Sequence, residues 1–341
     1  MKFAYFGNEA IGAMVEQRLE EAGHSVVDDT SQAQVILTYC TNQTQLEDVY
    51  FDSEGVIKNA PEGCLLIDLS ATTPQFAREL AALGMVSDLL VVEAPLVILD
   101  QSASDALVEK NNSTCFLSGE EDAKKKALPI LDVLFAAVED MGDTGAASMA
   151  RAALTIQSAS AMVSAIEADA LYRAVRAMPQ GLGMAAAGRA GALSPVSDAL
   201  LDAVEEGRFD GPCTVEMLMG QVAAALSTAE DAQVALPQTE GIMQLLEVLA
   251  IIGAAGKQPA VISLAYREQK DVEEHGLDWS RIQGYADQGS EGHIRYHDEI
   301  GGFDDMVDEE DYGFEDDDPG YGYDSERDEE YADFEDDDYI D

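Results

Sequence analysis

A glycine-containing turn near the N-terminus is the first feature that could do chemistry. The apolar run of residues 2–6 leads into Gly7, and Gly12 lies inside a helical pattern over residues 10–22. A turn at the start of a helix directs backbone N–H groups and the positive end of the helix dipole at one point, which suits a phosphate group. The candidate contacts are Gly7, Asn8, Ala10, Ile11 and Gly12.

Glu9 lies where a dinucleotide-binding turn has its middle glycine. A carboxylate there faces the diphosphate, and each charge pair at about 4–5 Å costs about 3–4 kcal/mol at an effective dielectric of about 20. The same carboxylate would stabilise the helix N-terminus that a phosphate otherwise occupies. Glu9 is therefore either a built-in substitute for the phosphate, or it points to solvent and the turn still binds.

The elements that would position this turn alternate between strand and helix. Short apolar runs predict strands, and the amphipathic segments between them predict helices. The expected strands are residues 2–6, 25–27, 35–39, 64–68, 89–92 and 114–117, and the expected helices are residues 10–22, 73–83 and 121–138. This alternation predicts an α/β domain with a doubly wound parallel sheet of the Rossmann type over residues 1–142.

The pattern becomes purely helical after this domain. Helical segments are expected at residues 145–178, 195–206, 214–232 and 238–255, with breaks at Pro195, Gly211-Pro212 and Pro237. Because no strand pattern returns, residues 143–272 are expected to form an all-helical domain. Residues 273–341 interleave acids with Gly, Tyr and Phe and lose apolar periodicity, which predicts a disordered acidic tail.

The charge of the chain excludes several classes of partner. The net charge is −48, and residues 291–341 hold 24 Asp and Glu against two Arg. Such a surface repels phosphate backbones, so no nucleic acid is expected, and the tail favours a basic protein partner. No run approaches the roughly 18 apolar residues of a membrane span, so the protein is not expected to bind a membrane. A cytoplasmic location is expected instead.

Metal and disulfide chemistry is not expected. The cysteines are widely spaced and form no CxxC pair: Cys40, Cys64, Cys115 and Cys213. His293 and His297 have the spacing of metal ligands on a helix, but they lie in the tail.

Several short motifs follow one another in a fixed order along residues 2–265. The first turn is similar to GLGxMG, residues 22–26 to AGHxV, residues 33–38 to ADVVIT, residues 68–74 to DxSTxxP, residues 93–95 to DAP, residues 142–145 to GxxG and residues 229–237 to AxxxGVPLP. This order resembles the 3-hydroxyisobutyrate (β-hydroxyacid) dehydrogenase family of 6-phosphogluconate dehydrogenase-like proteins. The resemblance implies an NAD or NADP cofactor, a small-molecule substrate and a homodimer. Apolar surfaces around residues 217–226 and 242–252 favour the same dimer.

The resemblance also implies a catalytic site. It places Arg151 at the family's proton-exchanging lysine and Thr155 at the asparagine that orients the substrate. Ser70 is retained from the DxST motif, either as a site residue or as a helix cap. The implied cofactor contacts are Gly7, Asn8, Ala10, Ile11, Gly12, Asp28, Tyr39, Cys40 and Ala71.

The aspartates Asp28 and Asp29 bear on the choice of cofactor. They follow Gly7 by about 21 residues, where an acid typically binds the ribose hydroxyls, although either could be an ordinary loop residue. No arginine follows them to bind a 2′-phosphate, so NAD is favoured over NADP.

Three departures from the family weaken the ordinary reaction. The guanidinium of Arg151 stays protonated, so it can bind a carboxylate or polarise a carbonyl but cannot exchange a proton; alternatively, Arg151 is simply a charged helix residue. Residues 97–99, Val-Ile-Leu, replace the SGG loop that binds the substrate carboxylate, leaving backbone amides but adding bulk. Gly220-Gln221 replaces the family's Lys-Asp pair.

These departures leave three functions open. The first is an NAD(P)-binding oxidoreductase of the 3-hydroxyacid dehydrogenase type with degenerate catalytic residues. The second is a non-catalytic dinucleotide sensor or scaffold that uses the aromatic-rich acidic tail. The third is an enzyme similar to the imine reductases.

Overall fold

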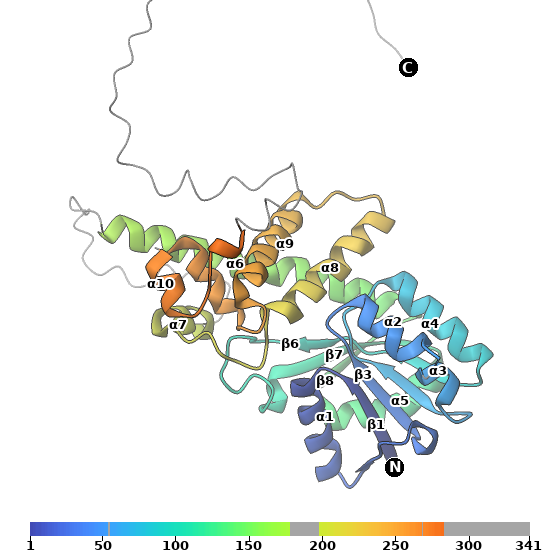
Figure 1. The fold of residues 1–341 in the computed structure, drawn as a ribbon. Helices are drawn as coiled ribbons and strands as arrows, with labels where there is room; N and C mark the ends of the chain where they lie inside the picture. Colours follow the sequence, from blue (N-terminus) through green and yellow to red (C-terminus); the bar gives the residue numbers. More distant parts are fainter. Residues whose placement is uncertain (54, 178–197, 268, 283–341) are drawn as a thin grey trace, which may run out of the picture. The chain divides into compact units, whose positions relative to one another are not determined.

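The computed structural model describes residues 1–53, 55–177, 198–267 and 269–282 (Figure 1). The part of the predicted tail from residue 283 onward, which includes His293 and His297, lies outside the described residues.

Residues 2–93 form five parallel strands with helices between them. Its elements are β1 (Lys2–Gly7), α1 (Glu9–Glu21), β2 (Ser25–Val26), β3 (Val35–Tyr39), α2 (Gln43–Phe51), α3 (Val56–Asn59), β4 (Leu65–Asp68), α4 (Pro74–Val86) and β5 (Leu90–Glu93). The strand order is β2-β1-β3-β4-β5. The predicted doubly wound α/β architecture is confirmed.

Both faces of this sheet are covered by helices, and alternate strand residues point to opposite faces. Leu37 and Ile67 pack with helices α1 and α5 (Glu121–Leu134), whereas Ile36 and Leu66 pack with α2 and α4. This packing gives the near-continuous apolar runs that reveal the strands in the sequence.

The sheet becomes mixed beyond β5. Strand β7 (Ser113–Gly119) runs antiparallel to β5 and β6 (Leu96–Ile98), and parallel to β8 (Ala137–Gly142). Two expectations were wrong here: residues 97–98 are strand instead of loop, and residues 137–138 belong to β8 instead of the preceding helix. Helix α5 ends at Leu134 because Phe135 is extended, and a short apolar run alone does not distinguish a last helical turn from a strand.

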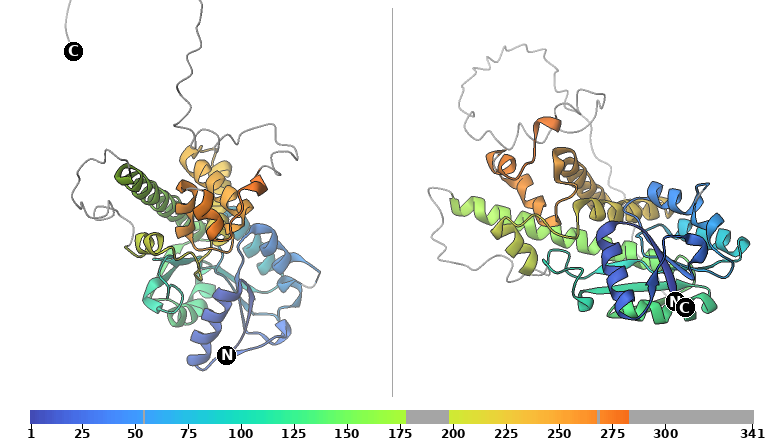
Figure 2. Two further views of the ribbon diagram at one scale, coloured as in Figure 1. Left: turned by 60° about the vertical axis from the view of Figure 1, so that its left-hand side comes forward. Right: turned by 60° about the horizontal axis from the view of Figure 1, so that its bottom comes forward.

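The rest of the described chain is helical, as predicted. It contains α6 (Ala146–Ala177), α7 (Asp198–Glu206), α8 (Val215–Asp231), α9 (Pro237–Leu249), a π-helical turn (Ala250–Ala254), a 3₁₀ segment (Pro259–Tyr266) and α10 (Gln269–Glu274). Figure 2 shows α6 as a long rod beside α8 and α9. Among the described residues after Gly142 no strand occurs.

The helical core extends beyond the predicted boundary at residue 272. Leu277 is 2% exposed, and Trp279 and Ile282 pack against the same apolar cluster. The tail therefore cannot begin at residue 273. The error arose because the buried side chains are spaced irregularly among acids and glycines, without a helical period.

The apolar segments expected to form a dimer surface are largely used inside the chain. The side chains of Met217, Leu218, Val222, Ala225, Ile242, Leu246, Leu249 and Ile252 are all buried. The argument for surplus apolar surface was therefore wrong, and the homodimer remains a prediction that light scattering can check.

None of the described helices is by itself long and apolar enough to cross a membrane. The bent pair Pro237–Ala254 and Pro259–Tyr266 passes this test only as a pair, by length and composition, with a bend of 92°. Its apolar residues belong to the core of the helical domain.

Leu277→Ala should lower the free energy of unfolding by about 2–4 kcal/mol, because it leaves a cavity in the helical core. The nearby substitution Lys270→Ala, at an exposed position, should change it by less than about 0.5 kcal/mol. Urea unfolding of the full chain measures both. Equal stabilities would show that the segment after α10 does not contribute to the core.

Candidate functional site

The glycine turn lies where the carboxyl ends of β1 and β3 meet. Gly7 has a φ of +123°, and a Cβ on it would lie 1.9 Å from the Tyr39 carbonyl oxygen. The Asn8 amide donates to the same oxygen at 2.8 Å, and Cys40 follows directly. Because β1 lies between β2 and β3, this is a point where the winding of the sheet reverses, and ligands of open α/β sheets bind at such points.

Asn8 caps helix α1 at this turn. Its Oδ1 accepts hydrogen bonds from the amides of Ala10 and Ile11, at 3.0 and 3.2 Å. Glu9 is exposed. The side-chain oxygen Oδ1 of Asn8, and not the Glu9 carboxylate, therefore occupies the amides that a diphosphate would use.

Gly12 is required for packing. A Cβ there would lie 2.7 Å from Cε1 of Tyr5, whose hydroxyl donates to the Asn8 carbonyl oxygen at 2.8 Å. The Tyr5 ring thus packs against Gly12 and is hydrogen-bonded to the backbone of the turn.

The two aspartates after β2 differ in their surroundings. Asp29 accepts hydrogen bonds from Ser31 and Gln32, which lower its pKa and make it the cap of a short 3₁₀ turn. Asp28 is exposed. Asp28 is therefore the carboxylate available to a ribose.

These residues fit a dinucleotide on one condition. The turn is open, since Gly7 is exposed, and Asp28 lies free at the end of β2. The amides of Ala10 and Ile11 would first have to be released by the Asn8 side chain.

A row of buried polar side chains crosses the sheet beside this turn. Thr38, Asp68, Glu93 and Ser118 lie in register on β3, β4, β5 and β7. Asp68 accepts hydrogen bonds from the Thr38 hydroxyl and the Ser70 amide, both at 3.0 Å. Burial, with a smaller contribution from the Glu93 charge, raises the pKa of Asp68 to about 6.

Ser70 joins two strand ends. Its hydroxyl oxygen accepts the Cys40 amide at 3.0 Å, and its side chain is 1% exposed. Helix α4 is capped by Thr73, so Ser70 is not the helix cap. The half-buried Ala71 follows it. Ser70 thus holds the loop after β3 against the end of β4.

Glu93 connects the sheet to the first turn of α6. Its carboxylate accepts hydrogen bonds from the Ser118 hydroxyl, the Gly145 amide, and both the amide and the hydroxyl of Ser148. All four donors and the carboxylate are buried. Sequence reasoning noted Glu93 only as part of a motif; an acid at the end of an apolar strand, ahead of a glycine turn and a helix, was the signal available.

Arg151 lies one helical turn after Ser148 and is 3% exposed. Its Nε donates to the Leu96 carbonyl oxygen at 3.1 Å, and its Nη1 donates to the Thr155 hydroxyl at 2.6 Å. Burial lowers the pKa of Arg151 to about 10, so the side chain stays charged at neutral pH. Within the described parts of the chain it forms no ion pair.

Tyr39 and Gln221 complete the surroundings of this charge. Burial raises the pKa of Tyr39 to about 12, against the opposing effects of the Arg151 charge and a hydrogen bond from Gln221. Gln221 is 8% exposed, and its Oε1 has no hydrogen-bond partner among the described residues. The structure thus brings together Arg151, Thr155 and Tyr39 from the predicted set and adds Gln221.

The segment that replaces the SGG loop does not offer free amides throughout. Leu96 N donates to the Leu69 carbonyl oxygen and Leu99 N to that of Asn112, both at 2.9 Å. The expectation of freely available amides is therefore wrong at Leu99, because the segment pairs with β7 as strand β6.

Gly220 lets α8 touch the nucleotide domain. A Cβ on Gly220 would lie 1.8 Å from the Thr41 carbonyl oxygen, so the two backbones are in direct contact. The Thr41 hydroxyl also donates to Glu216 on α8 at 3.2 Å. This contact was not predicted, since a lone helical glycine does not reveal what packs against it.

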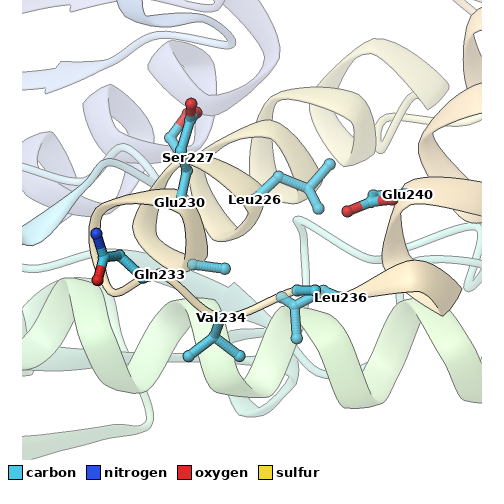
Figure 3. Close-up of a pocket in the computed structure, with 9 residues that line it drawn as sticks. Leu226, Ser227, Glu230, Gln233, Val234, Leu236 and Glu240 are labelled. Carbon is cyan, nitrogen blue, oxygen red and sulfur yellow. The ribbon is translucent and has the colours of Figure 1, made fainter.

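A pocket of about 520 Å³ lies at the connection between α8 and α9 (Figure 3). Its walls include Leu226, Val234 and Leu236 together with the exposed Glu230 and Glu240. None of the predicted site residues lines it. This pocket is therefore separate from the nucleotide turn and from Arg151.

The N-terminal domain matches a known domain family. Residues 7–142 match the model for the NAD binding domain of 6-phosphogluconate dehydrogenase. The chain is 27% identical over 209 residues to the uncharacterized oxidoreductase YkwC of Bacillus subtilis, covering 60% of this chain and 69% of that protein. It is 25% identical over 150 residues to the NAD-dependent L-serine dehydrogenase of Pseudomonas aeruginosa, covering 44% and 49%.

The fold is shared with a solved enzyme structure. A 3-hydroxyisobutyrate dehydrogenase from Salmonella typhimurium superposes with a TM-score of 0.61 at 18% identity, covering 77% of this chain and 99% of that one. Residues 7–142 thus form an NAD-binding domain of the 6-phosphogluconate dehydrogenase type, and the chain shares the fold of the 3-hydroxyisobutyrate dehydrogenases at low sequence identity.

Proposed function

We propose that this protein binds a nicotinamide dinucleotide at the Gly7 turn and a small carboxylate at Arg151, and that it oxidises ordinary hydroxy acids poorly. One observation carries the proposal: a buried guanidinium is held by two neutral oxygens, at the position to which the resemblance assigns the family's lysine. A buried charge without a counter-charge is costly, and a ligand carboxylate would supply one.

The residues around Arg151 hold a ligand better than they exchange a proton. A bound nicotinamide supplies hydride transfer, and oxidation of a hydroxyl also needs a base for its proton. With a pKa of about 10, Arg151 remains protonated near pH 7. Thr155 donates its own proton to the Arg151 carbonyl oxygen at 2.9 Å. A missing general base lowers a rate by about 10²–10⁴-fold, so binding should persist where turnover is weak.

The geometry favours a binding role over full catalysis. If the protein shows no turnover, the proposed function is that of a dinucleotide sensor. The exposed Asp28 favours NAD over NADP, because it suits free ribose hydroxyls and repels a 2′-phosphate. Calorimetric titration with all four nicotinamide nucleotides measures this preference.

Arg151→Met should weaken binding of 3-hydroxyisobutyrate or L-serine at least tenfold, because a charged hydrogen bond contributes about 1.5–3 kcal/mol. Unfolding stability should be unchanged or higher, since an apolar side chain removes a desolvated charge. Arg173→Met, on the same helix but ion-paired with Asp169, is the control and should leave binding intact. Equal ligand affinity in the two variants, or rapid turnover of either compound by the wild type, would contradict the proposal.

Asn8→Gly should tighten dinucleotide binding about fivefold, because it frees the Ala10 and Ile11 amides from a cap contributing about 1 kcal/mol. Glycine is itself tolerated at a helix N-cap, so stability should fall by only a few tenths of a kcal/mol. Asn42→Gly removes the equivalent cap of α2 and should leave affinity unchanged. Titration of NADH fluorescence measures all three proteins.

Glu9→Gly separates the two explanations for weak binding. If the Asn8 cap dominates, Glu9→Gly should improve affinity less than Asn8→Gly does, because the exposed Glu9 charge is screened by solvent. A larger gain from Glu9→Gly would show instead that the carboxylate is the main obstacle.

A further inference from the structure

The segment after β5 and the start of α6 are joined at two points. Glu93 accepts hydrogen bonds from Ser148, and the Leu96 carbonyl oxygen accepts one from Nε of Arg151. Glu93 and Leu96 are three residues apart, as are Ser148 and Arg151. The two contacts therefore run side by side, one helical turn apart.

We infer that Glu93 is a positioning residue, which places the Arg151 guanidinium for ligand binding by fixing the first turn of α6. The inference rests on the proposed anion site at Arg151, although its physical basis is independent of any ligand. Among the described residues no hydrogen bond or ion pair joins Glu93 to the guanidinium, so Glu93 acts through the helix.

The Glu93 carboxylate is well matched to this task. The first turn of a helix leaves amides without partners and carries the positive end of the helix dipole. Glu93 accepts the amides of Gly145 and Ser148, while the Ser118 hydroxyl oxygen accepts the Ala147 amide at 3.2 Å. The Ala146 amide donates to the Asp143 carbonyl oxygen at 3.1 Å. The start of α6 is thereby held from the sheet.

Length as well as charge matters at position 93. The carboxylate joins Gly145 and Ser118 through one oxygen and Ser148 through the other. Aspartate is shorter by one carbon–carbon bond, about 1.5 Å, and would lose part of this set. Glutamine keeps the length but places an NH₂ group against donors. Both substitutions should loosen the same helical turn for different reasons.

The hydrogen bonds that hold the Arg151 side chain depend on the position of the first turn of α6. Its two acceptors are Leu96 on the sheet side and Thr155 on α6 itself, so movement of α6 changes one distance and not the other. A guanidinium binds a carboxylate through a rigid fork, which makes binding sensitive to small displacements. An error of about 1 Å in a binding group can cost about 10²-fold in function.

Solvent exchange of the Arg151 Nε proton tests the inference without a ligand. The resonance is assigned by its loss in Arg151→Met. Glu93→Gln and Glu93→Asp should each speed its exchange at least tenfold. Asn42→Ala, which removes the N-cap of α2, should not. Ser148→Ala, a milder change that removes one hydroxyl donor to Glu93, should have a smaller effect in the same direction and serves if the Glu93 variants fail to fold.

A double-mutant cycle with 3-hydroxyisobutyrate as the probe tests the functional part. Glu93→Gln should weaken probe binding at least fivefold in the wild type and by less than twofold in Arg151→Met. Unchanged Nε exchange in every variant, or an equal loss of binding with and without Arg151, would overturn the positioning role. Failure of the wild type to bind the probe, with Nε exchange still dependent on Glu93, would instead refute the proposed function alone.

Discussion

A carboxylate removed from water must be surrounded by donors, and the structure meets this requirement at Glu93 by joining its two kinds of architecture. The strand that carries Glu93 belongs to the sheet, whereas three of the donors belong to the turn and helix that begin the helical domain. Without those donors the charge would be left unsatisfied, at a cost of several kcal/mol. These hydrogen bonds fix where helix α6 begins, and they thereby fix the position of its side chains, including that of Arg151.

The same requirement explains how the sheet edge is organised around one row of polar residues. Thr38, Asp68 and Glu93 lie at the carboxyl ends of apolar strands and share one register, so their side chains gather where the strands end. Ser70 extends the row to the loop after β3. The carboxyl edge of the sheet is thus polar and satisfied internally, while the glycine turn beside it remains open. At that turn the Asn8 side chain still occupies the Ala10 and Ile11 amides, which a phosphate would need.

The sequence predicts the sheet well because its strands are buried on both faces and its helices have one apolar stripe. Strands β6 and β8 lack these features, because β6 has only three residues and the six residues of β8 are mostly exposed. Arg151 and Thr155 could be located from the resemblance alone, and they do lie together. The partners of Glu93 could not be found that way, because they come from a distant segment of the chain. The cap made by Asn8 could not be found either, because the sequence does not show whether Asn8 or Glu9 turns toward the amides.

The backbone contact at Gly220 has a consequence for how this lineage could change. A side chain of any size at that position would collide with Thr41, so a lysine cannot be introduced there by one substitution. The loop after β3 would first have to retreat, and Thr41 is itself tied to Glu216 on the same helix. Position 220 and the loop after β3 can therefore change only together. A variant with a side chain at position 220 would thus need a second change that moves Thr41 away from helix α8.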